Sequence, residues 1–264
     1  FFVCSLGRGL SGAAEATVIA QAVSGLGLGL YLWKKEPYYR FSPKRFLREE
    51  KPVGEICGYS LMTGMQQSVM NFGILMVQSL VNSFGPAVMA AFAATVKIDT
   101  FAYMPAQEFG NAYSIFISQN FGAEKTERVK QGTGKAMTVS AVFCGLISVL
   151  VFAFARFLML IFVDAGETEI IEIGMQYLRI EGAFYIGIGI LFLLYGYFRG
   201  VNRPGVSLVL TVISLGTRVA LAYILAAVPG IGVLGIWWAI PIGWALADVT
   251  GIVLMRRGGT YGEK

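Results

Sequence analysis

The stretch that decides the fold is AVMAAFAATVKIDTFAYMPAQEFGNAYSIFISQNFGAEK, which runs from Ala87 to Lys125. Most of its residues are apolar or small, and about 33 residues of helix would extend roughly 50 Å, enough to cross a bilayer with tilt. Two ionisable side chains, Lys97 and Asp99, fall roughly 15–18 Å into this span, close to the bilayer midplane. A charged group there costs at least about 2.5–3.5 kcal/mol, so it normally faces a protein interior or a wet cavity. We therefore predict that this helix carries function.

The charges inside the predicted spans need partners from other helices. Lys97 and Asp99 are two residues apart, about 200° around a helix, so they do not face each other. Two more charged residues, Glu181 and Arg218, fall inside later apolar spans. We predict a buried network in which Arg218 contacts Asp99 or Glu181. The alternative interpretation is a packing device without a role in binding.

Further polar residues are predicted to line the same pathway. Glu108 lies three helical turns after Lys97 and shares its face, while Tyr103 shares the face of Asp99. The preceding span carries the amides Gln67 and Asn71, which together with aromatic rings suit a pocket for organic cations. The alternative interpretation of Glu108 is a solvated residue at a cavity mouth.

Composition predicts an all-α integral membrane protein. The chain has 264 residues, of which 56% are hydrophobic and only 14% charged, with a mean hydropathy of +0.65. Soluble domains are nearer a quarter charged, and transmembrane β-barrels show alternating segments of about ten residues rather than long apolar spans. The sequence contains no histidine and no nucleophile–base or metal-ligand pattern, so we expect no enzyme, no metal and no cofactor. The lipid bilayer is the predicted environment, and nucleic acid is not a predicted partner.

Seven apolar spans can be placed along the chain, and the charges between them predict an orientation. Most of the 21 Lys and Arg residues fall in alternate loops, around 34–51, 125–135, 199–203 and 256–264. The intervening loops around 83–86, 164–169 and 229–235 carry none. The positive-inside rule makes the basic loops and the C-terminus cytoplasmic. The spans are Ser11–Trp33, Val53–Asn82, Ala87–Gln119, Ala136–Phe162, Ile171–Phe198, Ser207–Val228 and Ile236–Met255.

Three segments carry a resemblance to a known family. They are GAAEATVIAQ at Gly12–Gln21, the segment Ala90–Lys125 within the stretch quoted above, and YGYFRGVNRP at Tyr195–Pro204. In this order and at this spacing they resemble the multidrug and toxic compound extrusion (MATE) family of antiporters over essentially the whole chain.

The resemblance implies twelve helices in two six-helix lobes around a central cavity. On that alignment, residues 1–33 are the last helix of the N-terminal lobe, 34–52 a basic cytoplasmic interlobe linker and 53–264 the six-helix C-terminal lobe. The chain begins with Phe rather than Met, and we expect it to be a fragment whose N-terminal lobe is missing. The implied activity is export of organic cations, drugs or metabolites across the plasma membrane of the cell in exchange for Na⁺ or H⁺.

The sequence departs from one branch of that family, which places coupling carboxylates in helices seven and ten. Here the corresponding part of helix seven, Met65–Asn71, has amides and no acid, and Tyr185–Leu194 of helix ten has no acid either. The coupling ion is therefore left open between Na⁺ and H⁺. Two other functions stay open: a lipid-linked oligosaccharide flippase of the same architecture, which would have a more basic groove, and a seven-helix receptor.

Overall fold

The computed structural model describes residues 8–35 and 53–257, and every regular element within them is a helix. The chain divides into two units, Phe1–Val53 and Gly54–Lys264, each considered by itself. The predicted interlobe linker lies almost entirely outside the described residues, as does the tail after Arg257. The helices are α1 (Gly9–Lys35), α3 (Val53–Asn82), α4 (Pro86–Gly122), α5 (Thr126–Leu160), α6 (Thr168–Gly182), α7 (Tyr185–Gly200), α8 (Pro204–Ala226) and α9 (Val233–Arg257).

The all-α membrane fold predicted from the sequence is confirmed. Five described helices are long and apolar enough to cross a membrane, namely α1, α4, α5, α8 and α9, and the bent pair of α6 and α7 makes a sixth candidate. Helix α3 occupies the remaining predicted span, Val53–Asn82, but does not meet the same test of apolarity. Its amides, among them Gln66, Gln67 and Asn71, lower its hydropathy.

Helix α1 is the described element of the first unit. An ion pair of 2.5 Å between Arg8 Nη1 and Glu15 Oε2 lies at its N-terminal end. Beyond that point its apolar side chains, such as Val18, Val23 and Leu26, are exposed within the unit. A helix that is apolar on all sides is typical of a membrane span.

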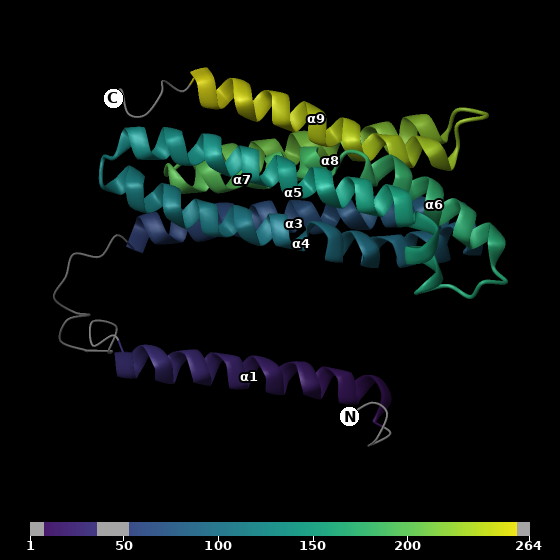
Figure 1. Cartoon of the computed structure of the whole chain (residues 1–264), viewed down its shortest axis with the longest axis horizontal. Coiled ribbons are helices and arrows are strands. Elements are labelled where there is room, and N and C mark those ends of the chain that lie inside the picture. Colours follow the sequence, from purple (N-terminus) through teal and green to yellow (C-terminus); the bar gives the residue numbers. More distant parts are fainter. Residues whose placement is uncertain (1–7, 36–52, 258–264) are drawn as a thin grey trace. The chain divides into compact units, whose positions relative to one another are not determined.

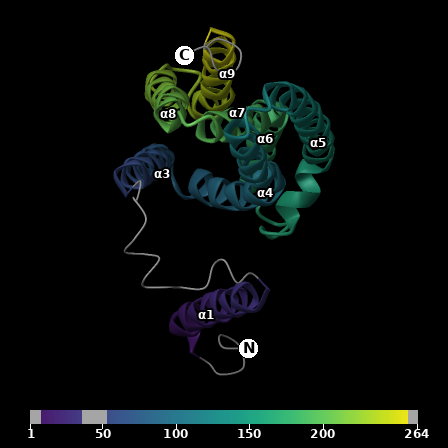
Figure 2. The ribbon, with the colours of Figure 1, turned by 90° about the vertical axis from the view of Figure 1, so that its left-hand side faces the viewer.

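Helix α7 forms the core of the second unit. Every residue from Leu191 to Phe198 is buried, because α7 packs against α4, α5, α8 and α9. Figure 2, which looks along the helices, shows α7 and α6 between α4 and α5 on one side and α8 and α9 on the other. A helix that is hydrophobic all round suits this central position.

Two glycines allow α4 and α7 to pack closely. A Cβ built on Gly196 would lie 2.5 Å from the carbonyl oxygen of Gly110, and a Cβ on Gly110 would lie 2.9 Å from that of Phe192. Small residues at membrane helix contacts let the backbones approach, since van der Waals packing drives association there. Any larger side chain at Gly196 would push the two helices apart.

The predicted span Ile171–Phe198 is not one continuous helix. The structure breaks it after Gly182, and α6 and α7 meet at an angle of 53°. At the break, Phe184 N donates to Glu181 O at 3.0 Å and Gly187 N donates to Phe184 O at 2.8 Å. These tight turns replace the regular helical bonds and redirect the chain. As a result, Glu181 lies in the last turn of α6 and Tyr185 begins α7.

Helix α3 rests on α8 through a few side-chain contacts. Gln66 Nε2 donates to Thr211 Oγ1 at 3.0 Å, and a Cβ on Gly73 would lie 3.2 Å from the Leu215 side chain. Few α3 residues are buried, among them Val77 and Val81. Helix α3 therefore lies beside α4 and α7 but is held to the rest of the unit by few contacts.

The turns of the second unit fall at two ends of the bundle. In Figure 1 the turn between α4 and α5 and the C-terminal end of α9 lie at the same end, and the turn between α5 and α6 lies at the other. The first end carries Lys125 and Arg128 as well as Arg256 and Arg257. The charge asymmetry predicted between loops thus corresponds to two ends of the helix bundle.

Candidate functional site

A cluster of acids and tyrosines lies at the break between α6 and α7. Asp99 of α4 and Glu181 of α6 are almost fully buried, with exposed fractions of 2% and 3%. The hydroxyl of Tyr185 donates a hydrogen bond to Asp99 Oδ1. Tyr177 and Glu181 are also close enough to interact with the Asp99 carboxylate. The break assembles this cluster, because it turns Glu181 and Tyr185 toward the same residue of α4.

Aromatic packing fixes the position of Tyr177. Its ring makes edge contacts with Trp237 at 4.8 Å and with Phe92 at 5.7 Å between centroids. Phe92 and Trp237 in turn stack at 5.7 Å. Such pairs are worth about 0.5–1.5 kcal/mol each beyond their buried area, so Tyr177 is held rigidly beside the acids.

The acids are not neutralised by a direct ion pair. Asp99 Oδ2, Glu181 Oε2 and Arg218 Nε are each buried without a hydrogen-bond partner. The charges of all three residues interact, yet no nitrogen of Arg218 lies within 4.0 Å of either carboxylate. The predicted contact of Arg218 with Asp99 or Glu181 is therefore wrong. Arg218 belongs to α8, which packs mainly against α7 and α9 rather than against α4 or α6.

A cavity separates Arg218 from the acids. Glu181, Arg218 and Tyr103 line a space of about 140 Å³. A second space of about 200 Å³ adjoins it, and the two share Met70 and Gln107 as well as Phe192 and Tyr195. We call the joined space the polar groove. Its other polar lining residues are Thr63, Gln66, Gln67, Asn111, Arg199 and Ser214.

A chain of polar contacts closes one end of the polar groove. Arg199 Nη2 donates to Asn111 Oδ1 at 3.0 Å, and Asn111 Nδ2 donates to Glu108 Oε2 at 3.3 Å. Glu108 itself is exposed. The position of Glu108 agrees with the alternative in which it lies at a cavity mouth, while Asn111 and Arg199 face the groove.

The predicted site residues separate into two groups. Four of them line the polar groove, namely Tyr103, Gln67, Glu181 and Arg218. Asp99 does not line it but lies next to Glu181. Lys97 and Asn71 are exposed and line neither of its two cavities. Lys97 faces away because it is two residues from buried Asp99, about 200° around α4. The roles of all these residues in transport stay predictions.

Sequence reasoning missed several residues of the site. No feature of the sequence marked Tyr177, Tyr185 or Gln107 as functional, because uncharged polar residues are common in membrane helices. Asp248 of α9, which does not line the polar groove, could have been selected, because it is an acid inside the predicted span Ile236–Met255. It is buried beside Gly187, and its Oδ1 has no hydrogen-bond partner. Like Asp99, it is an ionisable residue inside an apolar span, where a charge normally faces the protein interior.

The donor set does not suit a chelated metal. Within the described parts of the chain, no group of three or more His, Cys, Asp or Glu side chains is placed to hold a metal ion. What the cluster offers is two carboxylates, tyrosine hydroxyls and one guanidinium around a small cavity. This arrangement can bind a proton, a weakly held monovalent cation or a cationic group of a ligand.

Comparison with known proteins gives consistent matches. The family model MatE matches residues 63–224. The probable multidrug resistance protein YpnP of Bacillus subtilis is 29% identical over 213 residues, which are 81% of this chain and 47% of the relative. The probable multidrug resistance protein YoeA of the same organism is 27% identical over 249 residues, covering 90% and 52%. The chain thus spans about half the length of these curated relatives.

A solved structure shows the same fold. A MOP superfamily transporter from Pyrococcus furiosus superimposes with a TM-score of 0.89 at 21% identity, covering 97% of this chain and 58% of that one. The part matched by the family model runs from α3 to α8, and these helices supply all of the polar groove except Trp244 of α9.

Proposed function

Because the chain belongs to the MatE family, we propose that it forms part of a secondary-active antiporter that exports organic cations, drugs or metabolites. The names of its relatives as probable multidrug resistance proteins support this proposal. Export would proceed by alternating access in exchange for Na⁺ or H⁺. The protein is a multi-pass membrane protein, and we place it in the plasma membrane with its basic turns on the cytoplasmic side.

The observation that carries the proposal is the charge balance of the buried cluster. Asp99 and Glu181 are both buried, while Arg218 supplies one positive charge at the same cavity. When both acids are ionised, the cluster carries one net negative charge inside a membrane-spanning bundle. Such a charge is costly unless a partner balances it. A proton, a Na⁺ ion or a cationic substrate group would each restore neutrality, which is the basis for exchange between them.

The small size of the polar groove supports the proposal of a second wall. Its two spaces measure about 140 and 200 Å³. Even joined, they reach only the lower limit of sites that enclose a drug-sized molecule, roughly 300–1,000 Å³. We propose that a second lobe of the same polypeptide completes the cavity, as the resemblance to two-lobe antiporters implies. Purified 264-residue chain in proteoliposomes should accordingly show no ion-gradient-driven uptake of a fluorescent cation, and robust uptake would contradict a half-site.

Efflux measurements on the full-length transporter test the proposal. We expect Asp99→Asn and Glu181→Gln each to lower efflux of a fluorescent organic cation at least tenfold. The matched control is Glu172→Gln, which removes an exposed acid from the same helix as Glu181. Equal efflux by all three variants would rule out the acid cluster as the exchange site. Loss of efflux for a lipid-linked oligosaccharide, without loss for the cation, would favour the flippase instead.

The orientation has its own test. Glu124 lies in the turn between α4 and α5, and Gly166 lies in the turn between α5 and α6 at the other end of the bundle. We expect an impermeant thiol reagent added to intact cells to label Gly166→Cys and to spare Glu124→Cys. The reverse pattern would overturn the proposed topology.

A further inference from the structure

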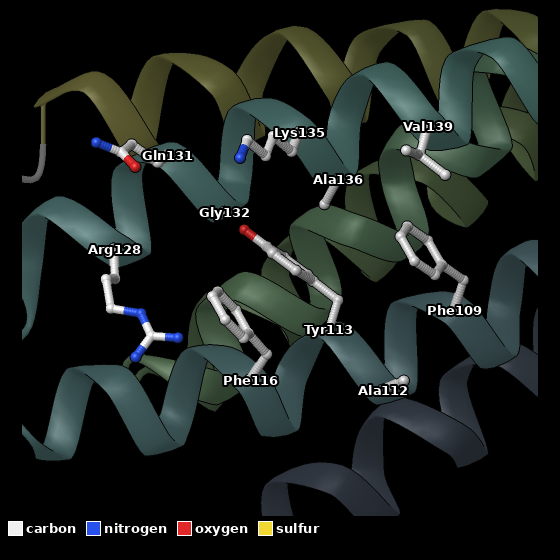
Figure 3. Close-up of a pocket in the computed structure, with 10 residues that line it drawn as sticks. All are labelled: Phe109, Ala112, Tyr113, Phe116, Arg128, Gln131, Gly132, Lys135, Ala136 and Val139. Carbon is white, nitrogen blue, oxygen red and sulfur yellow. The ribbon is translucent and has the colours of Figure 1, made fainter.

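A second groove lies on the other side of α4, between α4 and α5. It has a volume of about 510 Å³. Figure 3 shows Phe109, Tyr113 and Phe116 of α4 on one side and Arg128 and Lys135 of α5 on the other. A smaller space of about 210 Å³ continues it, since both are lined by Phe109 and Val139. We call the combined space the lateral groove. It does not share a lining residue with the polar groove.

The floor of the lateral groove is built by specific contacts between the two helices. The hydroxyls of Tyr113 and Thr133 form a hydrogen bond of 2.7 Å. A Cβ on Gly132 would lie 2.3 Å from the Phe116 ring, so the ring occupies its position only because residue 132 is glycine. The groove is thus a defined feature of the α4–α5 interface.

The two ends of the lateral groove differ in chemistry. Arg128 and Lys135 line its wide end, and neither lies within 4.0 Å of any carboxylate that the structure describes. The nearby acid Glu127 accepts a hydrogen bond from Gln131 at 3.0 Å. The narrow end is lined almost only by apolar residues, from Pro105 to Phe143. One end therefore favours an anion, and the remainder favours hydrocarbon.

The length of the lateral groove matches one leaflet of a bilayer. Its lining on α4 runs from Phe116 at the basic end to Pro105 at the apolar end, eleven residues or about 16 Å of helix. The hydrocarbon of a single leaflet is about 15 Å thick. The outer surface of α5 beside the groove carries exposed apolar side chains such as Val142 and Leu146, as expected where a helix meets lipid.

We propose that the lateral groove binds one anionic phospholipid. Arg128 and Lys135 would hold its phosphate, and an acyl chain would lie along Phe109 and Val139. Basic pockets between membrane helices at the interfacial level bind anionic head groups in this way. The proposal requires only that the chain spans a membrane, so it stands independently of the proposed transport activity.

Native mass spectrometry of the intact protein in detergent tests the proposal with phosphatidylglycerol and phosphatidylcholine of equal chain length. We expect phosphatidylglycerol to bind roughly 10- to 30-fold more tightly, given two cations at the mouth. The double variant Arg128→Gln, Lys135→Gln should reduce that preference to about twofold or less. The matched control, Lys130→Gln with Arg257→Gln, removes the same charge outside the groove and should keep the preference.

A second pair of variants tests the hydrocarbon part. Val139→Trp would fill the lateral groove, whereas Val142→Trp places the same bulk outside its lining; the two valines are exposed by 55% and 59%, so both variants should fold. We expect only the first to abolish tight phosphatidylglycerol binding. Equal binding of the two lipids, or unchanged preference after loss of both cations, would overturn the proposal. Competition by inorganic phosphate at equal concentration would instead assign a simple anion site and also overturn it.

Discussion

The two faces of α4 line two cavities of opposite character. Tyr103, Gln107 and Asn111, spaced four residues apart, line the polar groove. Phe109, Ala112 and Phe116, spaced three and four apart, line the lateral groove. Both sets follow the period of one helix. The polar stripe faces α3, α7 and α8, while the apolar stripe faces α5.

The difference shows how a membrane helix divides its surface. In a soluble protein most polar side chains face the solvent. In a membrane span, polar side chains instead face the interior of the helix bundle or a cavity. On α4 the polar stripe accordingly turns toward buried Glu181 and Arg218. The apolar stripe turns toward a groove with cations only at one end. The next five experiments alter one face or the other, and the expected effects decrease from the first to the last.

The largest effect is expected from separating α4 and α7. Gly196→Val would place side-chain atoms against the backbone of Gly110, which a Cβ would already approach to 2.5 Å. Overpacking costs about 1–3 kcal/mol and more where backbone must move, so we expect a loss of about 3 kcal/mol or more. Thermal unfolding of the detergent-solubilised protein measures it. Gly216→Val is the control, since a Cβ there meets nothing within 4 Å.

Removal of one hydroxyl behind the polar face should have the next largest effect. Tyr185→Phe leaves buried Asp99 without the hydrogen bond that it accepts on Oδ1. A buried acceptor without a partner costs about 1–3 kcal/mol, and more when it is charged. We expect a lower unfolding temperature together with reduced efflux. Tyr223→Phe removes a hydroxyl at an exposed tyrosine, and a similar loss there would show that the cluster has no special role.

The contact of α3 with α8 should contribute less. Gln66→Leu removes a buried hydrogen bond of 3.0 Å to Thr211. Such bonds between membrane helices average about 0.6 kcal/mol and reach about 1.7 kcal/mol, so a loss in this range is expected. The double variant with Thr211→Val leaves no unpaired Thr211 hydroxyl, but it also removes the bond that Thr211 Oγ1 donates to Ser207 O at 2.9 Å. We expect it to be about as stable as Gln66→Leu, because Ser207 O is also a backbone acceptor within helix α8. A larger loss in the double variant would mean that Thr211 has another essential partner.

The coupling between Asp99 and Arg218 should be smaller still. Their charged atoms lie more than 4.0 Å apart. The stability lost on neutralising Asp99 should therefore not be regained when Arg218 is neutralised as well. A double-mutant cycle with Asp99→Asn and Arg218→Gln is expected to give about 1 kcal/mol or less. Breaking a direct buried pair costs about 3–5 kcal/mol. A coupling in that higher range would restore the ion pair predicted from the sequence.

The smallest effect concerns transport after a change on the apolar face. Val139→Trp fills the lateral groove but touches no residue that lines the polar groove. We expect efflux to stay within about twofold of wild type in cells. A loss as large as that of Glu181→Gln would mean that the two faces of α4 act together.

Hydropathy and charge were enough to predict the helical spans, which turns carry Lys and Arg and which carry none, and the buried position of Asp99 and Glu181. They did not reveal the break after Gly182, because the residues Ala183 and Phe184 include no proline and form an ordinary apolar run. Hydropathy and charge also led to the wrong prediction that Arg218 contacts the acids, because the positions of charges in a sequence do not tell which helices are neighbours. Tyr185 owes its role to the break, so no local pattern in the sequence marks it.

The break between α6 and α7 also has a mechanical consequence. Helix α7 has 16 residues, about 24 Å of rigid rod, and it starts at a joint next to Glu181. At that length a change of 5° in the 53° angle displaces the far end by about 2 Å. The far end carries Gly200 and leads into α8, so it meets the basic end of the bundle. A change of a few degrees in the bend at the acids would therefore move the basic end of the bundle by about 2 Å.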